Sequence, residues 1–493
     1  MSTDTVADMD LQRPNILWYC TDQQRFDTIG ALGNPHIRTP NLDQFVAEST
    51  AFTHAFCQSP ICTPSRASFL TGMYPSRVHN PRNGNAWVHP TVTEHLVTRK
   101  LADSGYDGGL VGKLHLAGAA GAREPRVNDG YRYFKYSHAP RHDWPLDQHA
   151  YAAWIADQGI EPETVLLKEH DPRHQHGSLI EPTLAQDNTP PEFHQTKWAT
   201  DSAIEFITQD RPARQPWFLS VNVYDPHPPY NPPWEYYSRY EIGSLPGPHF
   251  KDTDLAHQDM LTKVGIDFQS EARHPDQIEG RKIQAAYYAM VEQIDEHFGR
   301  LLQGLSASGQ LDNTIVIFTS DHGESAGDYG LTQKGCRFFD GLTRVPLIWR
   351  LPNKIQAGVQ SNALVELTDI APTLLDYAGL PTPDDVQGRS LRALLEGRTP
   401  AGVHRDFVRC EYLDAIDTPD GTRATMYRDH RWKLNVYHGH DVGELYDLDD
   451  DPYEHRSLWE SSAHQDIKLK LLQRSFDATF LASDPGPPRV SPY

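Results

Sequence analysis

The sequence lacks the features of membrane-spanning, secreted and disulfide-stabilised proteins. No stretch of the 493 residues is long and apolar enough to span a bilayer. The five cysteines are too few and too scattered for a disulfide framework, and their number is odd. They are Cys20, Cys57, Cys62, Cys336 and Cys410. The polar segment 1–12 has no apolar core flanked by basic residues, so we expect a disordered leader and a cytoplasmic protein without membrane association.

Positive charge is also scarce. The chain has 45 Lys and Arg against 66 Asp and Glu, which gives a net charge of −21 at pH 7. This balance argues against a nucleic-acid partner and against an anionic membrane surface. An anionic substrate must therefore meet a local cationic pocket. The sequence has no internal repeat or low-complexity tract, and it leaves the oligomeric state open, a homo-oligomer included.

The order of apolar segments predicts an α/β fold. Segment 14–22 is a continuous apolar run that ends on a carboxylate, as in a buried parallel strand. Further strands are predicted at 106–111, 217–223, 314–320 and 345–350, and helices at 42–48, 196–207, 281–305 and 367–378. Because strands and helices alternate, we expect a large mixed, mostly parallel sheet sandwiched by helices.

The pattern changes twice along the chain. We expect a catalytic α/β domain at 13–398. Within it, segment 119–196 has weak periodicity and predicts a loop-rich insertion. The irregular spacing of its histidines favours a solvated loop over a second metal site. These are His138, His142, His170, His174 and His176. Short segments at 407–411, 424–428, 432–436 and 445–448, with a helix at 467–480, predict a smaller C-terminal α+β domain at 399–493 that carries a short antiparallel sheet.

Polar side chains follow several of the predicted strands. Asp22, Lys113 with His115, and Asp321 with His322 come directly after strands. The carboxyl ends of parallel strands meet at one edge of a sheet, where α/β folds bind ligands. A lone Asp or His after a strand is usually a cap or a surface group. The occurrence of such polar residues after several predicted strands favours a catalytic or binding site.

The segment 62–72 contains the most specific motif, Cys-x-Pro-Ser-Arg-x-x-x-x-Thr-Gly. A chance match in a chain of this length is roughly one in a hundred thousand. A single Cys beside a Pro turn is more often a small buried hydrophobe. The complete motif instead favours Cys62 as the precursor of a nucleophile.

The motif resembles the signature of the type I sulfatases of the alkaline phosphatase superfamily, which are close to the phosphonate monoester hydrolases. In this family a formylglycine-generating enzyme oxidises the Cys to formylglycine, whose hydrated aldehyde attacks sulfur. The resemblance covers nearly the whole chain, and segment 444–452 resembles the signature of the family's C-terminal domain. It implies a sulfatase that cleaves a sulfate monoester of a small molecule.

The resemblance also implies roles for individual residues. Asp22, Asp321 and His322 would bind one divalent metal together with the formylglycine from Cys62, and Gln23 is a further candidate ligand. Arg66 would hold the formylglycine, while Lys113 and Lys334 would bind sulfate oxygens. His115 would assist the formylglycine hydroxyl, and His227, between prolines, would protonate the leaving group. Asn83 matches a substrate-binding Asn of the phosphonate monoester hydrolases.

These residue types suit the chemistry of a charged ester. Cations offset the repulsion between a sulfate and its nucleophile, and a metal lowers the pKa of a hydroxyl group. The second hydroxyl of the hydrated aldehyde lets sulfate leave by collapse to the aldehyde, without further attack at sulfur.

Two departures from the family leave alternatives open. Many sulfatases have two successive Asp where this chain has Asp22-Gln23, and Asn where it has His322. Ca²⁺ is the expected metal, with Mn²⁺ as a rival. The same substitutions occur in phosphonate monoester hydrolases, so a phosphonate monoester or phosphodiester hydrolase is the alternative activity. A non-catalytic binding protein for sulfated ligands is a third hypothesis, and phenyl, choline, lipid and sugar sulfates all remain candidate substrates.

Overall fold

The computed structural model describes residues 13–140, 143–166, 189–210, 212, 215–266, 268–416 and 421–483. The predicted leader lies outside these residues, as do four of the five histidines named above, His142, His170, His174 and His176. Within the described ranges, no helix combines the length and apolarity needed to cross a membrane. The cytoplasmic location stays a prediction.

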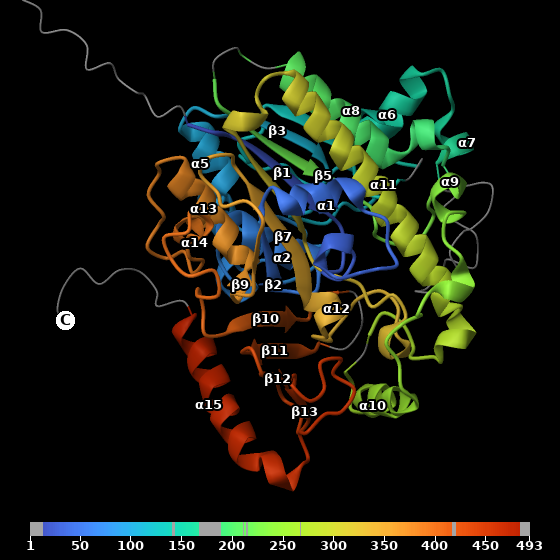
Figure 1. Cartoon of the computed structure of the whole chain (residues 1–493), viewed down its shortest axis with the longest axis vertical. Helices are drawn as coiled ribbons and strands as arrows, with labels where there is room; N and C mark the ends of the chain where they lie inside the picture. The colour runs from blue at the N-terminus through green and yellow to red at the C-terminus, as the bar shows by residue number, and fades with distance from the viewer. Residues whose placement is uncertain are drawn as a thin grey trace, which may run out of the picture.

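A nine-stranded sheet forms the centre of the molecule (Figure 1). Its strands are β1 Asn15–Thr21, β2 Thr50–Phe56, β3 Asp107–Gly112, β4 Tyr133–Tyr136, β5 Trp217–Asn222, β6 Thr314–Ser320, β7 Arg344–Arg350, β8 Val359–Ser361 and β9 Val365–Glu366. Their order is β4-β3-β5-β1-β6-β7-β2-β8, and β9 pairs with β2. The run from β4 to β6 is parallel, whereas β7 is antiparallel to both β6 and β2. The prediction of a mixed, mostly parallel sheet is therefore confirmed.

Helices cover both faces of this sheet (Figure 1). They are α1 Pro40–Ala47, α2 Cys62–Thr71, α3 Pro75–Val78, α4 Pro90–His95, α5 Val97–Asp103, α6 Ala150–Asp157, α7 Pro162–Val165, α8 Gln195–Thr208, α9 Trp234–Tyr237, α10 Asp252–Lys263, α11 Gly280–Ala307, α12 Asp340–Thr343, α13 Ile370–Tyr377 and α14 Arg392–Leu395. Side chains of β1 alternate between the two faces. Ile16 and Trp18 join a core with α2, α5 and α13, whereas Leu17 and Tyr19 join a core with α1, α8 and α11. A strand buried on both faces explains the continuous apolar run at 14–22.

A second, antiparallel sheet follows near the C-terminus. Its strands, in spatial order, are β10 Val408–Leu413, β11 Arg423–Arg428, β12 Trp432–Tyr437 and β13 Gly443–Asp447, and helix α15 Gln465–Leu481 packs on β11 and β12. Cys410 and Met426 join the main core, whereas Leu434 packs with Leu471 of α15. The predicted C-terminal antiparallel sheet is confirmed. Since one core cluster includes residues on both sides of position 399, the division into two domains there stays a prediction.

Two segments contain more regular structure than the sequence predicts. The segment 50–56 forms β2, whose Phe52 is paired with Leu347 of β7. The predicted loop-rich insertion contains β4, which extends the parallel sheet beyond β3, as well as α6 and α7. Both β2 and β4 are stabilised by partners distant in sequence, and strand formation depends on such context more than on intrinsic propensity.

Candidate active site

Cys62 is the first residue of helix α2. Pro64 fits the first helical turn, and every residue of α2 is buried. The Cys62 thiol lies 2.8 Å from the ammonium nitrogen of Lys334 and 3.1 Å from Nε2 of His322. Burial would raise the pKa of this thiol, but the charges of Lys113 and Lys334 hold it well below its usual range. Residue 62 is therefore surrounded by groups that stabilise negative charge.

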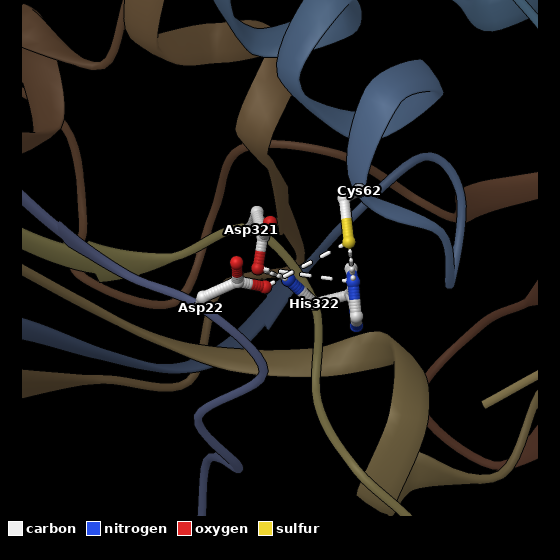
Figure 2. Close-up of side chains that lie close together, drawn as sticks. All are labelled: Asp22, Cys62, Asp321 and His322. Carbon is white, nitrogen blue, oxygen red and sulfur yellow. Dashed lines mark hydrogen bonds and ion pairs between the residues drawn. The ribbon is translucent and has the colours of Figure 1, made fainter. Parts of the chain in front are cut away.

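Four ligand-type side chains converge around this thiol. One ligand atom from each of Asp22, Cys62, Asp321 and His322 lies within 4.8 Å of the others, and all four residues are buried. Figure 2 shows their side chains pointing toward one another from separate segments. Asp22 follows β1 and Asp321 follows β6. Because β1 and β6 pair in parallel, the two carboxylates leave the sheet side by side.

The chemistry of these four groups fits a divalent cation. Nδ1 of His322 lies 2.8 Å from the carbonyl oxygen of Gly323. A carbonyl only accepts, so Nδ1 carries a proton, and in the neutral ring that binds a metal Nε2 presents a lone pair to the cluster. Burial raises the pKa of Asp321 against the pull of Arg66, and the neighbouring Asp22 carboxylate raises it further. A bound cation would relieve this repulsion, and two carboxylates with one imidazole suit Ca²⁺ or Mn²⁺.

Three buried cations, Arg66, Lys113 and Lys334, border the cluster. Arg66 donates from Nε to Asp321 at 2.8 Å and from Nη1 to the carbonyl oxygen of Lys113 at 3.1 Å. The Lys113 ammonium donates to the Asp22 carboxylate. Burial would raise the pKa of Asp22, but nearby cations, Lys113 foremost, hold it well below its usual range. These cations form the local pocket that a negatively charged protein needs in order to bind an anion.

The turn after β3 positions Lys113 and His115. Gly112 has a φ of +98°, and a Cβ there would lie 2.0 Å from the carbonyl oxygen of Asn222 on β5, so only glycine fits. His115 has a φ of +58°, which is uncommon for a residue with a side chain. The buried carboxylate of Glu124 accepts the backbone N–H of His115 at 2.5 Å and thereby holds this turn in place.

Two imidazoles lie beside the cations. Nε2 of His227 is 3.3 Å from the Lys334 ammonium, and its Nδ1 is 2.6 Å from the carbonyl oxygen of Pro228. Nδ1 of His115 is buried and has no hydrogen-bond partner among the described residues. Burial lowers the pKa of both rings well below 6.5, helped by Lys334 at His227 and by Lys113 at His115. Both rings are therefore neutral at pH 7 in this arrangement.

Asn83 and Gln23 lie at the site, but their side chains bond to protein groups. Oδ1 of Asn83 accepts the backbone N–H of Thr63 at 2.9 Å. The amide of Gln23 accepts from the ammonium of Lys334 and donates to the carboxylate of Glu324. Substrate binding by Asn83 and metal binding by Gln23 stay predictions.

His138 is a further neighbour of the site, although it was predicted to lie in a solvated loop. Strand β4 ends at Tyr136, so His138 follows a strand end as Asp22 and Asp321 do. Its ring centroid lies 4.8 Å from that of His115. The aromatic run 133–136 was the available signal for a strand.

Comparison with known proteins shows the family. A model described as "Sulfatase" matches residues 14–380, which is most of the chain. The chain belongs to the sulfatase family. A second model, "N-sulphoglucosamine sulphohydrolase, C-terminal", matches residues 327–479 of this sulfatase.

The sulfatase is similar to characterised and solved proteins over nearly its whole length. It is 29% identical to an arylsulfatase of Clostridium perfringens, with 92% of each chain covered. It is 28% identical to a "multifunctional alkaline phosphatase superfamily protein" of Trinickia caryophylli, with 91% of each covered. The crystal structure of a phosphonate monoester hydrolase of Agrobacterium radiobacter superposes with a TM-score of 0.78 at 25% identity, with 96% of each chain covered.

Family membership establishes the reaction class. The protein is a sulfuric ester hydrolase that acts on small anionic sulfate esters. The family also implies a metal and a formylglycine, and the buried cluster of Asp22, Cys62, Asp321 and His322 is compatible with both.

Proposed function

We propose that this sulfatase cleaves sulfate monoesters with a formylglycine formed from Cys62, after maturation by a formylglycine-generating enzyme. The single observation that carries this proposal is the position of Cys62, whose thiol lies among two cations, an imidazole and a carboxylate at the edge of a parallel sheet. A plain structural cysteine would sit among apolar groups. Here the surroundings suit a nucleophile and a charged ester instead.

Asp22, Asp321 and His322 would hold one metal ion together with residue 62. When bound, the metal would supply the positive charge that lowers the pKa of a hydroxyl of the hydrated formylglycine. Arg66 keeps Asp321 in place and lies in the same helix as residue 62, so it would also hold the formylglycine. We propose Ca²⁺ as this ion, with Mn²⁺ as the competing candidate.

The two lysines and two histidines would handle the substrate. Lys113 and Lys334 would bind oxygens of the transferred sulfate. Both ammonium groups contact the cluster, that of Lys113 at Asp22 and that of Lys334 at Cys62. Neutral His115 would accept a proton from the formylglycine hydroxyl. His227 would protonate the leaving oxygen from Nε2 once that nitrogen has taken up a proton, because in this arrangement the ring is neutral and Nδ1 donates to Pro228.

Mass spectrometry of the peptide that contains Cys62 tests the nucleophile. We expect the CH₂SH group to be replaced by CHO in protein purified from its native host. A fully unmodified thiol in active enzyme would exclude the proposed chemistry.

Removal of the metal tests the ligand set. Dialysis against a chelator should abolish turnover and lower the melting temperature, and Ca²⁺ should restore both better than Mn²⁺ does. Elemental analysis of Asp321→Asn should show loss of one metal ion per chain relative to wild type. Full restoration by Mn²⁺ with none by Ca²⁺ would reverse the choice of metal.

A phosphonate monoester or phosphodiester hydrolase with the same nucleophile is the second candidate. The occurrence of Gln23 and His322 at the site and the likeness to a phosphonate monoester hydrolase favour it. We expect kcat/KM to be higher for an aryl sulfate than for the matched aryl phosphonate. A large preference for the phosphonate would reverse this order.

A further inference from the structure

Glu324 is a buried carboxylate that the proposed chemistry leaves without a role. It is inaccessible to solvent, and its oxygens accept hydrogen bonds from the amide of Gln23 and, at 3.2 Å, from the backbone N–H of Ala326. Among the described residues it forms no ion pair with a Lys, Arg or His. A buried carboxylate without an ionic partner is costly. Its contact with the active site runs through the amide of Gln23.

Gln23 connects Glu324 to Lys334. An ammonium only donates and a carboxylate only accepts, so the amide oxygen of Gln23 faces Lys334 and its NH₂ group faces Glu324. The backbone of Gln23 is held as well, because its N–H donates to Asp321 at 3.0 Å and its carbonyl oxygen accepts from the hydroxyl of Tyr287. This amide has one orientation available, and both of its ends are occupied.

We propose that Glu324 is a positioning residue, which fixes the ammonium of Lys334 through the amide of Gln23. The inference rests on the proposed role of Lys334 in binding the transferred group. Lys334 has a flexible four-carbon stem. Its ammonium contacts the Gln23 amide, the Cys62 thiol at 2.8 Å and Nε2 of His227 at 3.3 Å. Of these partners, Gln23 is the one whose side chain is bound at its other end by Glu324.

The relay explains why a glutamine can stand beside Asp22. Its amide oxygen is used by Lys334, and its nitrogen cannot bind a metal while it donates to Glu324. Gln23 is therefore placed to serve the substrate-binding lysine, while its amide oxygen, which has a second lone pair, stays a candidate metal ligand. Displacement of a catalytic group by about 1 Å can lower a rate by ~10²-fold. Loss of the contact between Glu324 and Gln23 should therefore lower kcat.

A double-mutant cycle tests the relay. Glu324→Met keeps the volume of the side chain but removes the acceptor, and we expect kcat for a sulfate ester to fall by ~10–10²-fold. Glu324→Gln still offers an amide oxygen to Gln23 and should stay within a few-fold of wild type. In a Lys334→Ala background, Glu324→Met should change kcat by less than ~2-fold, because its effect passes through the missing ammonium.

A purely structural role predicts a different result. Glu324→Met would then lower kcat by the same factor in both backgrounds, which overturns the inference. An unchanged kcat in Glu324→Met overturns it too. If Glu324→Met does not fold, Gln23→Leu breaks the relay at its centre and should show the same dependence on Lys334.

Two controls separate this inference from the proposed function. Lys334→Ala alone should lower turnover strongly; if it does not, the proposed role of Lys334 fails, and the inference with it. If Lys334→Ala is inactive but Glu324→Met is normal, only the relay fails. Glu444 is another fully buried carboxylate, which accepts from Asn435 and Tyr437 at 2.8 Å in the C-terminal sheet and lies 2.7 Å from Nε2 of His257. Glu444→Met should lower the melting temperature and leave kcat per folded molecule unchanged.

Discussion

The active site and the contact between the two sheets are both built from buried charges, but they differ in how those charges are matched. We define the inter-sheet charge cluster as Asp340, Arg344, Arg428, Lys433 and Glu454. Lys433 donates to Asp340 at 2.7 Å, to the carbonyl oxygen of Phe338 at 2.9 Å and to the Glu454 carboxylate. Asp340 also accepts from Arg428 at 2.5 Å. Every donor of this lysine has an oxygen partner.

The active-site cations are matched less completely. The Lys334 ammonium faces a thiol and a ring nitrogen in addition to one amide oxygen. Nη2 of Arg66 has no hydrogen-bond partner among the described residues and lies 3.8 Å from Asp22. Buried donors without strong acceptors are costly, and an anionic substrate would satisfy them. Arg428 of the inter-sheet charge cluster also has an Nε without a hydrogen-bond partner among the described residues, so the two clusters differ in their lysines: Lys433 has three oxygen partners, whereas Lys334 has one.

Loss of the nucleophile should have the largest effect of all. Cys62→Ala should reduce turnover below detection, because it removes the side chain from which the proposed nucleophile is formed. Steady-state assays with an aryl sulfate check this. Cys410→Ala removes a thiol that is equally buried but lies in β10, and it should retain turnover per folded molecule. Activity in Cys62→Ala would contradict the assignment.

Disruption of the inter-sheet charge cluster should affect stability and leave chemistry intact. Lys433→Met leaves Glu454 without its buried ionic partner and removes one of the cations that face Asp340. The expected cost is about 3–5 kcal/mol in the free energy of unfolding. Chemical denaturation gives this value, and kcat per folded molecule should equal that of wild type. A fall in kcat without a fall in stability would contradict a purely structural role for the inter-sheet charge cluster.

Removal of an active-site cation should show the opposite pattern. Lys113→Ala removes a donor that faces the site, and deletion of one preorganised donor typically lowers kcat by ~10²–10³-fold. Some stability should be lost too, because Asp22 loses a partner. Measurement of kcat and of the unfolding free energy in the same preparations shows whether the loss of activity exceeds the loss of stability. A variant that is unstable but fully active per folded molecule would show that Lys113 contributes to stability and not to catalysis.

The smallest expected effect is a dependence of stability on pH. Burial would raise the pKa of Asp340, but Arg428, Lys433 and Arg344 hold it well below its usual range. The unfolded chain then binds more protons than the folded chain below about pH 4, so the free energy of unfolding falls as the pH drops there. Asp340→Asn should be less stable at neutral pH and should lose less stability on acidification. Equal acid dependence in both proteins would contradict this account.

Much of the fold could be predicted from local patterns. The apolar runs of β1, β5 and β6 and the amphipathic stripe of α11 are strong signals within one segment. The strands β2 and β4 carry weaker signals and depend on pairing with β7 and β3. His138 lies in a loop as predicted, but the pairing of β4 with β3 brings this loop against His115, so the prediction of a solvated loop failed for the same reason.

The sequence by itself determined the chemistry of the site. The motif at 62–72 and the polar residues after the strands name the groups, because strand ends and short motifs are properties of local sequence. Tertiary structure alone decided what those groups touch. The pairing of β1 with β6 brings Asp22 beside Asp321, and a loop after β6 carries Lys334 to Cys62. The relay from Glu324 through Gln23 also arises from contacts about 300 residues apart in the chain, which no local pattern encodes.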